Sequence, residues 1–192
     1  MSTKVSSGIS LSTNYFLRNF YTNNQNVMKS SGRTNYSNVE LSYEDSRALN
    51  RAAKRLSKSD YGSDTDEKDD ALNETSRAAI EAFVDTYNNT ITSGKSSSDY
   101  ETKLYVKQLN TLSKKHADDL SDLGITINSD GTLDLNKDLL KTANNSKARK
   151  VLSSDQEYPQ KLVKLSRRMN SAVQDNIFSL ISTQNMHIDI SL

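Results

Sequence analysis

The chain has 192 residues, a formal net charge of +1 and only 34% hydrophobic residues, with no Trp and no Cys. The lack of Cys excludes disulfides, thiolate metal ligands and Cys nucleophiles. The near-zero charge gives no general attraction to nucleic acid or to an anionic membrane. No apolar run reaches the roughly 18 residues that a membrane-spanning helix needs. So polar a chain predicts one domain with a tail, built from elongated helices that each bury a single apolar stripe.

The N-terminal segment, residues 1–41, is polar and contains no acidic residue before Glu40. Its one apolar cluster lies between Gly8 and Tyr21, and we expect the segment to be partly disordered. Two interpretations remain open: a tail whose aromatic patch docks on the body, and an uncleaved export signal. No hydrophobic stretch typical of a Sec signal peptide is present near Met1.

The main domain is predicted over residues 42–186, and its first helix runs from Ser42 to near Gly62. One face of this helix is apolar and the opposite face is basic; the basic face comprises Arg47, Arg51, Lys54, Arg55 and Lys58. A basic stripe can contact phosphates, but this one lacks interleaved aromatic residues and precedes the acidic segment 60–70. A solvated face is therefore the favoured interpretation.

A second helix is predicted from about Ala71 to Ser93, ended by Gly94, and a third from a capping pair at Ser98 and Glu101. The stripe of the second helix comprises Leu72, Ser76, Ile80, Phe83, Tyr87 and Ile91, with Ala79 and Val84 beside it. The seam of the third comprises Tyr105, Leu109, Leu112, His116, Leu120 and Leu123. His116 is accordingly expected to be a packed histidine, and Gly124 should end this helix with a positive φ angle.

The most specific local pattern is a small β-hairpin predicted at about 125–135. Apolar residues alternate on both sides of Asn128-Ser129-Asp130-Gly131, and Gly131 should adopt positive φ in a type I′ or bulged turn. Asn136 should then cap a helix that buries Leu139, Leu140 and Ala143. The loop also resembles a calcium loop in spacing, but Lys137 stands where a bidentate Glu is required, so no metal is predicted.

The rest of the domain is predicted to contain a short helix or irregular segment around Val151 and Leu152, then a last helix capped by Ser154 with Pro159 in its first turn. The seam of the last helix comprises Leu162, Leu165, Met169, Val173, Ile177 and Leu180, with Ala172 and Ile181 beside it. Residues 187–192 alternate in polarity and are assigned to a tail or a short strand.

Two segments in this order, about forty residues apart, resemble the flagellar filament-cap family (hook-associated protein 2). The first is the F-V-x-x-Y-N helix and the second is the L-G-I … D-G-T-L hairpin, within a likeness that covers about Thr75 to Gln174. The residues that carry it are Phe83, Val84, Tyr87, Asn88, Leu123, Gly124, Ile125, Asp130, Gly131, Thr132 and Leu133. The chain lacks the family's β-rich outer domains and long terminal heptads.

The resemblance implies a mainly α fold: an elongated helical bundle or coiled-coil-like trunk with one small hairpin. It also implies a structural or assembly protein, exported to the extracellular flagellum, whose partners are copies of itself or filament and hook-junction proteins. The residues themselves contain no nucleophile–base pair, phosphate loop or metal motif, so no catalysis, cofactor or small-molecule substrate is predicted. Binding to nucleic acid and insertion into a membrane are not predicted either. The alternative is a cytoplasmic stand-alone binding or scaffolding module that reuses this trunk.

Overall fold

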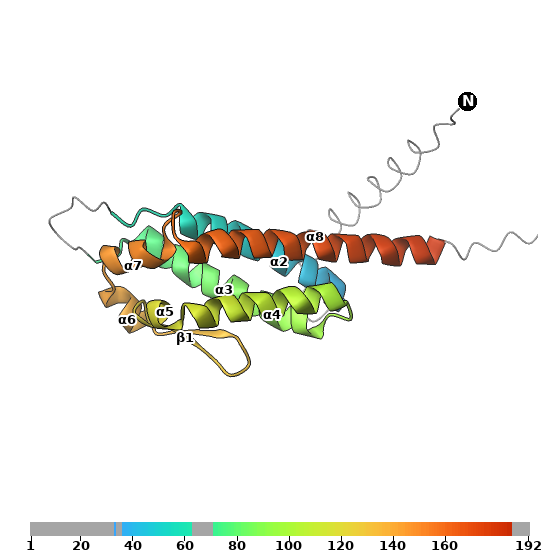
Figure 1. Ribbon diagram of the computed structural model, residues 1–192, viewed down its shortest axis with the longest axis horizontal. Helices are drawn as coiled ribbons and strands as arrows, with labels where there is room; N and C mark the ends of the chain where they lie inside the picture. Colours follow the sequence, from blue (N-terminus) through green and yellow to red (C-terminus); the bar gives the residue numbers. More distant parts are fainter. Residues whose placement is uncertain (1–32, 34–35, 63–70, 186–192) are drawn as a thin grey trace, which may run out of the picture.

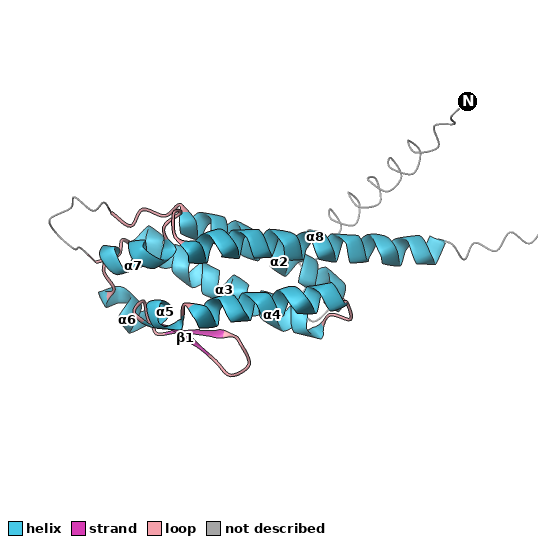
Figure 2. Cartoon of the chain, in the orientation of Figure 1, coloured by secondary structure: helices cyan, strands magenta, loops and turns pink. Residues whose placement is uncertain are grey.

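The computed structural model describes residue 33, residues 36–62 and residues 71–185, apart from the side chains of 182–185. This part of the chain is mainly α with one small β-hairpin, as predicted (Figures 1 and 2). Its elements are α2 (Asn38–Ser57), α3 (Glu74–Ser96), α4 (Tyr100–Lys115), α5 (Ala117–Ser121), β1 (Ile125–Ile127), β2 (Leu133–Leu135), α6 (Lys137–Thr142), α7 (Asn145–Leu152) and α8 (Glu157–Asn185).

The four long helices form an elongated bundle in which consecutive long helices run in opposite directions (Figure 1). Helix α2 packs against α3 and α8, and α4 packs against α8 and α3. The hairpin and the short helices α5, α6 and α7 fill the connection between α4 and α8 at one end, while α8 continues past the other helices at the opposite end (Figure 1). Within the described ranges, no helix combines the length and apolarity that crossing a membrane requires.

Three helix starts differ from the predictions because neighbouring polar residues compete to be the cap. Helix α2 begins a turn before Ser42, because Ser37 and Glu40 form a complete capping box. Helix α3 is capped by Asn73, whose side chain accepts a hydrogen bond from the Ser76 amide at 2.7 Å. Helix α4 is capped by Asp99, since its carboxylate is the stronger acceptor for the Thr102 amide, at 2.7 Å.

Gly94 was expected to end the second helix, and this prediction was wrong. The glycine lies inside α3, and its burial reflects the close approach of two other helices. A Cβ atom added at Gly94 would lie 2.4 Å from Val106 Cγ2 and 2.8 Å from Met169 Cε. The residue therefore permits contact between α3, α4 and α8 rather than a turn. Helix α2 likewise ends at Ser57, before Gly62.

The larger of two core clusters in the described residues joins the bundle to the hairpin, and the smaller one comprises Tyr43, Val173 and Ile177 between α2 and α8. The predicted stripes are largely confirmed, with Leu72, Phe83, Leu109, Leu162 and others buried, but two predicted core leucines are exposed. Leu139 on α6 is 53% exposed, and Leu180 on α8 is 46% exposed. On α8 the nearby Ile177 and Ile181 pack against Tyr43 and Val39 of α2, so Leu180 lies beside the buried face of the helix and not on it.

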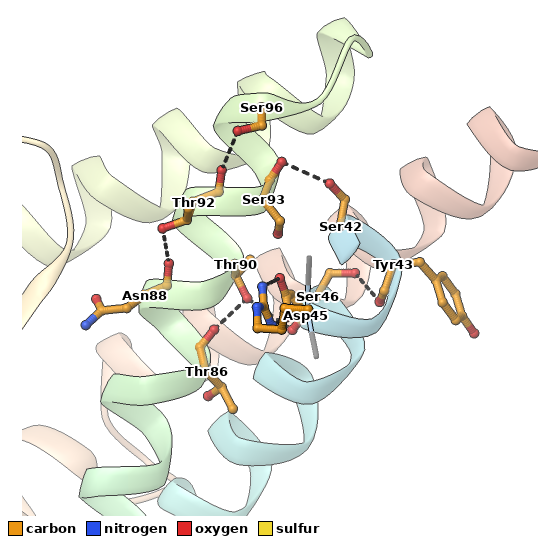
Figure 3. A network of polar contacts seen from close by, with 11 residues as sticks. Ser42, Tyr43, Asp45, Ser46, Thr86, Asn88, Thr90, Thr92, Ser93 and Ser96 are labelled. Carbon is orange, nitrogen blue, oxygen red and sulfur yellow. Dashed lines mark hydrogen bonds and ion pairs between the residues drawn. The ribbon is translucent and has the colours of Figure 1, made fainter. Parts of the chain in front are cut away.

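Small polar side chains allow α2 and α3 to pack closely, as Figure 3 shows. The Ser42 hydroxyl donates to the Ser93 carbonyl at 3.1 Å, and the Thr90 hydroxyl donates to the Asp45 carbonyl at 3.0 Å. On the other side of α2, Asn170 of α8 donates to the Tyr43 carbonyl at 3.2 Å. These bonds satisfy polar groups inside the bundle, which explains how so polar a composition forms a helical core.

Several predictions fall on residues outside the described ranges. These are the aromatic cluster and export signal of the N-terminal segment, most of the acidic segment 60–70, and the terminal strand at 187–192. Of the segment assigned as the tail, Asn38 to Leu41 belong to α2, and Arg33 forms a bidentate ion pair with the buried Asp45 carboxylate, with both N–O distances at 2.8 Å.

Candidate functional site

The two segments that carry the family resemblance meet in space. Asn88 of α3 donates from Nδ2 to the Leu133 carbonyl at 2.8 Å, and its Oδ1 accepts from the Leu133 amide at 2.7 Å. The Asn88 side chain thus pairs with the backbone of β2 as a neighbouring strand would. Strand β1 pairs with β2 in the antiparallel direction, with Ile125 opposite Leu135 and Ile127 opposite Leu133. We call this two-bonded junction the α3–hairpin contact.

Most of the motif residues are core residues. The side chains of Phe83, Tyr87, Leu123 and Ile125 are fully buried, and Val84 and Leu133 are nearly so. Phe83 makes edge-on contacts with two tyrosine rings, Tyr87 at 5.7 Å and Tyr158 at 6.3 Å between centroids. These residues hold the hairpin and the bundle together, so they are not themselves available to a partner.

The remaining motif residues shape the chain reversals, as predicted. Gly124 and Gly131 have φ angles of 79° and 82°, a conformation that side chains with a Cβ atom resist. The Gly131 amide donates to the Asn128 carbonyl at 2.9 Å and the Asn128 amide to the Thr132 carbonyl at 2.8 Å, while Ser129 and Asp130 keep negative φ. This is a type I turn followed by a glycine bulge, so of the two predicted turns the bulged form is confirmed.

The Asp130 carboxylate serves the same turn. It accepts from the Thr132 hydroxyl at 2.6 Å and from the Thr132 amide at 2.9 Å, which lowers the pKa of Asp130. Lys95 of α3 donates to the Asp130 carbonyl and ties the loop to the bundle. The described residues contain no group of three or more His, Asp or Glu side chains that could hold a metal ion.

A buried cluster of three hydroxyl groups, which was not predicted from the sequence, lies between α3, α4 and α8. Ser113 of α4 donates to the Tyr87 hydroxyl at 3.0 Å and lies 3.2 Å from the Tyr158 hydroxyl of α8. Burial raises the pKa of Tyr87 to about 12 and that of Tyr158 further, so both phenols are neutral near pH 7. Through the Ser113 hydroxyl, the two neutral phenols connect α3, α4 and α8, which is a packing role.

His116 lies between α4 and α5 and packs its ring edge-on against Tyr158 at 5.4 Å. Its Nδ1 atom lies 3.2 Å from an Asp119 carboxylate oxygen, and its Nε2 atom lies 3.8 Å from Glu157. The nearby Ser113 hydroxyl is bonded to tyrosines and not to this ring. The packing expected for His116 is therefore observed, and these contacts do not form a nucleophile–base pair.

A basic groove lies between α4 and α8 and was not predicted. It has a volume of about 520 Å³, and its lining includes five cationic residues and no carboxylate. We call it the α4–α8 groove; it is lined by Leu104, Lys107, Gln108, Thr111, Leu112 and Lys115 of α4 and by Lys161, Lys164, Leu165 and Arg168 of α8.

Glu157 pairs with two of the lysines that line the α4–α8 groove. Its carboxylate accepts from Lys115 at 2.7 Å and also pairs with Lys161, and the two cations lower the pKa of Glu157 to about 2. A second hollow of about 470 Å³ shares Lys164 and Arg168 with the groove, and its lining also includes Arg167, Glu101 and Asp175. Among the described residues, no ion pair involves Lys107, Lys164 or Arg168.

The sequence contained a signal for this groove, but only in part. Basic residues recur at helical spacing along both helices, at Lys107 and Lys115 and again at Lys161, Lys164 and Arg168. Each set by itself is typical of a solvated face. Only the packing of α4 beside α8 brings the two sets together over shared leucines.

In comparisons with protein-family models, with curated proteins and with solved structures, nothing matches the chain. The likeness to the filament-cap family therefore rests on the motif residues alone.

Proposed function

We propose that this chain is a flagellar structural or assembly protein related to the filament cap, which acts by protein–protein association and turns over no small substrate. The observation that supports the proposal is the α3–hairpin contact. Two short motifs that resemble one family lie forty-five residues apart at Asn88 and Leu133 and make paired hydrogen bonds, so they form one structural unit.

In this proposal, the motif unit builds the trunk and the outer faces of the helices bind the partners. Phe83, Tyr87 and Leu133 are buried, so they cannot be contact residues without unfolding. Association must use exposed positions, and we place it on the outer edges of α3 and α8, whose inner faces are needed for the core. The partners would be copies of this chain or filament and hook-junction proteins, outside the cell after flagellar export.

A second candidate function starts from the same trunk. The described residues form a helical bundle with one small hairpin, and a stand-alone cytoplasmic binding or scaffolding module needs no more than such a trunk. It differs from the first proposal in location and partner, and not in fold.

Cell fractionation separates the two candidates. The full chain would be followed by immunoblotting in cells with flagellar export intact and in an otherwise identical strain with export disabled. The first proposal expects the chain outside the cell only when export is intact, as flagellin behaves in the same samples. Retention in the cytoplasm of both strains, with flagellin exported normally, would favour the stand-alone module.

Sedimentation across a concentration series tests the association itself. We expect weak self-association, in the micromolar range or looser, which corresponds to roughly 8 kcal/mol or less. The reason is that filament-type interfaces gain affinity from many subunits, whereas this chain would meet one copy at a time. A strict monomer at high micromolar concentration that also binds neither flagellin nor hook-junction proteins would contradict the flagellar proposal.

A further inference from the structure

The α4–α8 groove carries more positive charge than the folded chain neutralises. Of its five cations, Lys115 and Lys161 share the carboxylate of Glu157. Lys107, Lys164 and Arg168 have no ion pair within the described part of the chain. Like charges gathered on two adjacent helices repel one another, so this arrangement gives the isolated fold no electrostatic benefit.

The lining of the same groove is partly apolar. It includes Leu104, which is 39% exposed, together with Leu112 and Leu165. Tyr100, at the start of α4, is 77% exposed, so apolar side chains continue to be exposed along this helix. A groove whose lining combines leucines with cations from two helices matches a ligand that is apolar on one face and acidic on the other.

We propose that the α4–α8 groove binds an acidic amphipathic helix of a partner protein. The leucines take the apolar face of that helix, and Lys107, Lys164 and Arg168 pair with carboxylates along its flanks. The bound helix lies against both α4 and α8 and extends the bundle by one member. This assignment rests on the proposed association function. It adds a surface on α4 to the outer edge of α8 proposed above, and it adds the chemical class of the partner.

Charge complementarity favours this occupant over a nucleic acid. Nucleic-acid surfaces combine cations with exposed aromatic platforms for bases, whereas the apolar residues that line this groove are leucines, and Tyr100 and Tyr105 are not part of its lining. Phosphates would leave those leucines in water. A helix of another protein covers both the charges and the leucines.

The test measures fluorescence anisotropy of a labelled synthetic peptide with the full chain at physiological salt. The peptide has about 18 residues, or five helical turns, with leucines on one face and glutamates on the other. We expect saturable binding that Lys107→Glu with Lys164→Glu weakens at least tenfold. The matched control is Arg51→Glu with Lys54→Glu, which makes the same change in net charge on exposed positions of α2 and should weaken binding less than threefold.

Four outcomes would overturn the inference: no saturable binding, equal weakening by both double variants, full binding of a peptide whose leucines are serines, or equal competition by an oligonucleotide of the same charge. Self-association that the groove variant abolishes and the peptide does not inhibit would instead assign the surface to a second copy. The fractionation experiment is independent of all these readouts. Export without peptide binding leaves the flagellar proposal intact and rejects the groove as a binding site. Peptide binding without export supports the groove as a binding site and contradicts the flagellar proposal.

Discussion

The α3–hairpin contact and the α4–α8 groove are opposites in their chemistry. At the contact, every polar group that Asn88 meets is paired, and the surrounding apolar residues are buried. In the groove, leucines are partly exposed and three cations have no described ion pair. Paired and buried groups stabilise a fold, whereas unpaired and exposed ones do not. The comparison therefore assigns stability to the first region and binding to the second.

The largest effect should follow from truncating a buried ring of α3, the helix that carries the contact. Phe83→Ala removes a fully buried side chain that touches two tyrosine rings and leaves a cavity. We expect a loss of about 3–5 kcal/mol in the free energy of unfolding, measured by chemical denaturation. A loss below about 1 kcal/mol would mean that the core tolerates this cavity and would contradict the stabilising role of the buried face of α3.

A smaller but more specific effect should follow from Asn88→Ala. The substitution leaves the Leu133 amide and carbonyl on the outer edge of β2 without their partner. We expect a loss of about 1–3 kcal/mol, because unpaired and partly buried backbone groups retain their desolvation cost. Asn89→Ala, a change of the same chemistry at the next position of α3, should change stability by less than about 0.5 kcal/mol. Equal losses in the two variants would show that the paired bonds contribute nothing specific.

The hairpin turn should be sensitive at Gly131 through the backbone. Its φ angle is 82°, and an added Cβ would lie 2.5 Å from Asn110 Nδ2. Gly131→Val should lower stability by about 1–2 kcal/mol, since a β-branched residue resists this conformation. Calcium titrations by calorimetry should be flat for wild type and variant alike. A wild-type response at micromolar calcium would reject the interpretation of Asp130 as a turn residue.

The ion pairs of Glu157 with Lys115 and Lys161 should make the free energy of unfolding weakly dependent on pH. The folded pKa of Glu157 is lowered to about 2 by Lys115 and Lys161, against about 4.3 in an unfolded chain. Its contribution to stability is therefore complete above the unfolded value and is lost as the pH falls towards about 2. Urea denaturation should show wild type and Glu157→Gln converging across that window. Because the side chain is exposed, the difference at neutral pH should be small, and a constant difference across the window would contradict this ion pair.

The two regions also differ in how far the sequence alone could predict them. The hairpin, its glycine bulge and the Asn136 cap follow from local turn and capping chemistry, and each was predicted near its observed position. Helix faces were predicted from periodicity, because an apolar stripe has one buried side. Local chemistry decided these features without knowledge of the neighbouring helices.

What could not be predicted depends on which helices become neighbours. Gly94 looked like a helix end, but it permits three helices to approach one another. Leu180 continued an apolar stripe but is 46% exposed, because Ile177 and Ile181 are the residues that face α2 there. The Ser113–Tyr158 bond joins residues forty-five positions apart. The groove belongs to the same class, because its cations become one surface only after α4 and α8 pack together.

The smallest expected effect completes the comparison. Lys107→Glu with Lys164→Glu changes two exposed residues that form no described ion pair, so no stabilising contact is lost and some repulsion across the groove is relieved. We expect the free energy of unfolding to stay within about 0.5 kcal/mol of wild type, in the same denaturation assay that detects the loss from Phe83→Ala. A loss comparable to that of Asn88→Ala would mean that these lysines support the fold, and the division between a stabilising contact and a binding groove would fail.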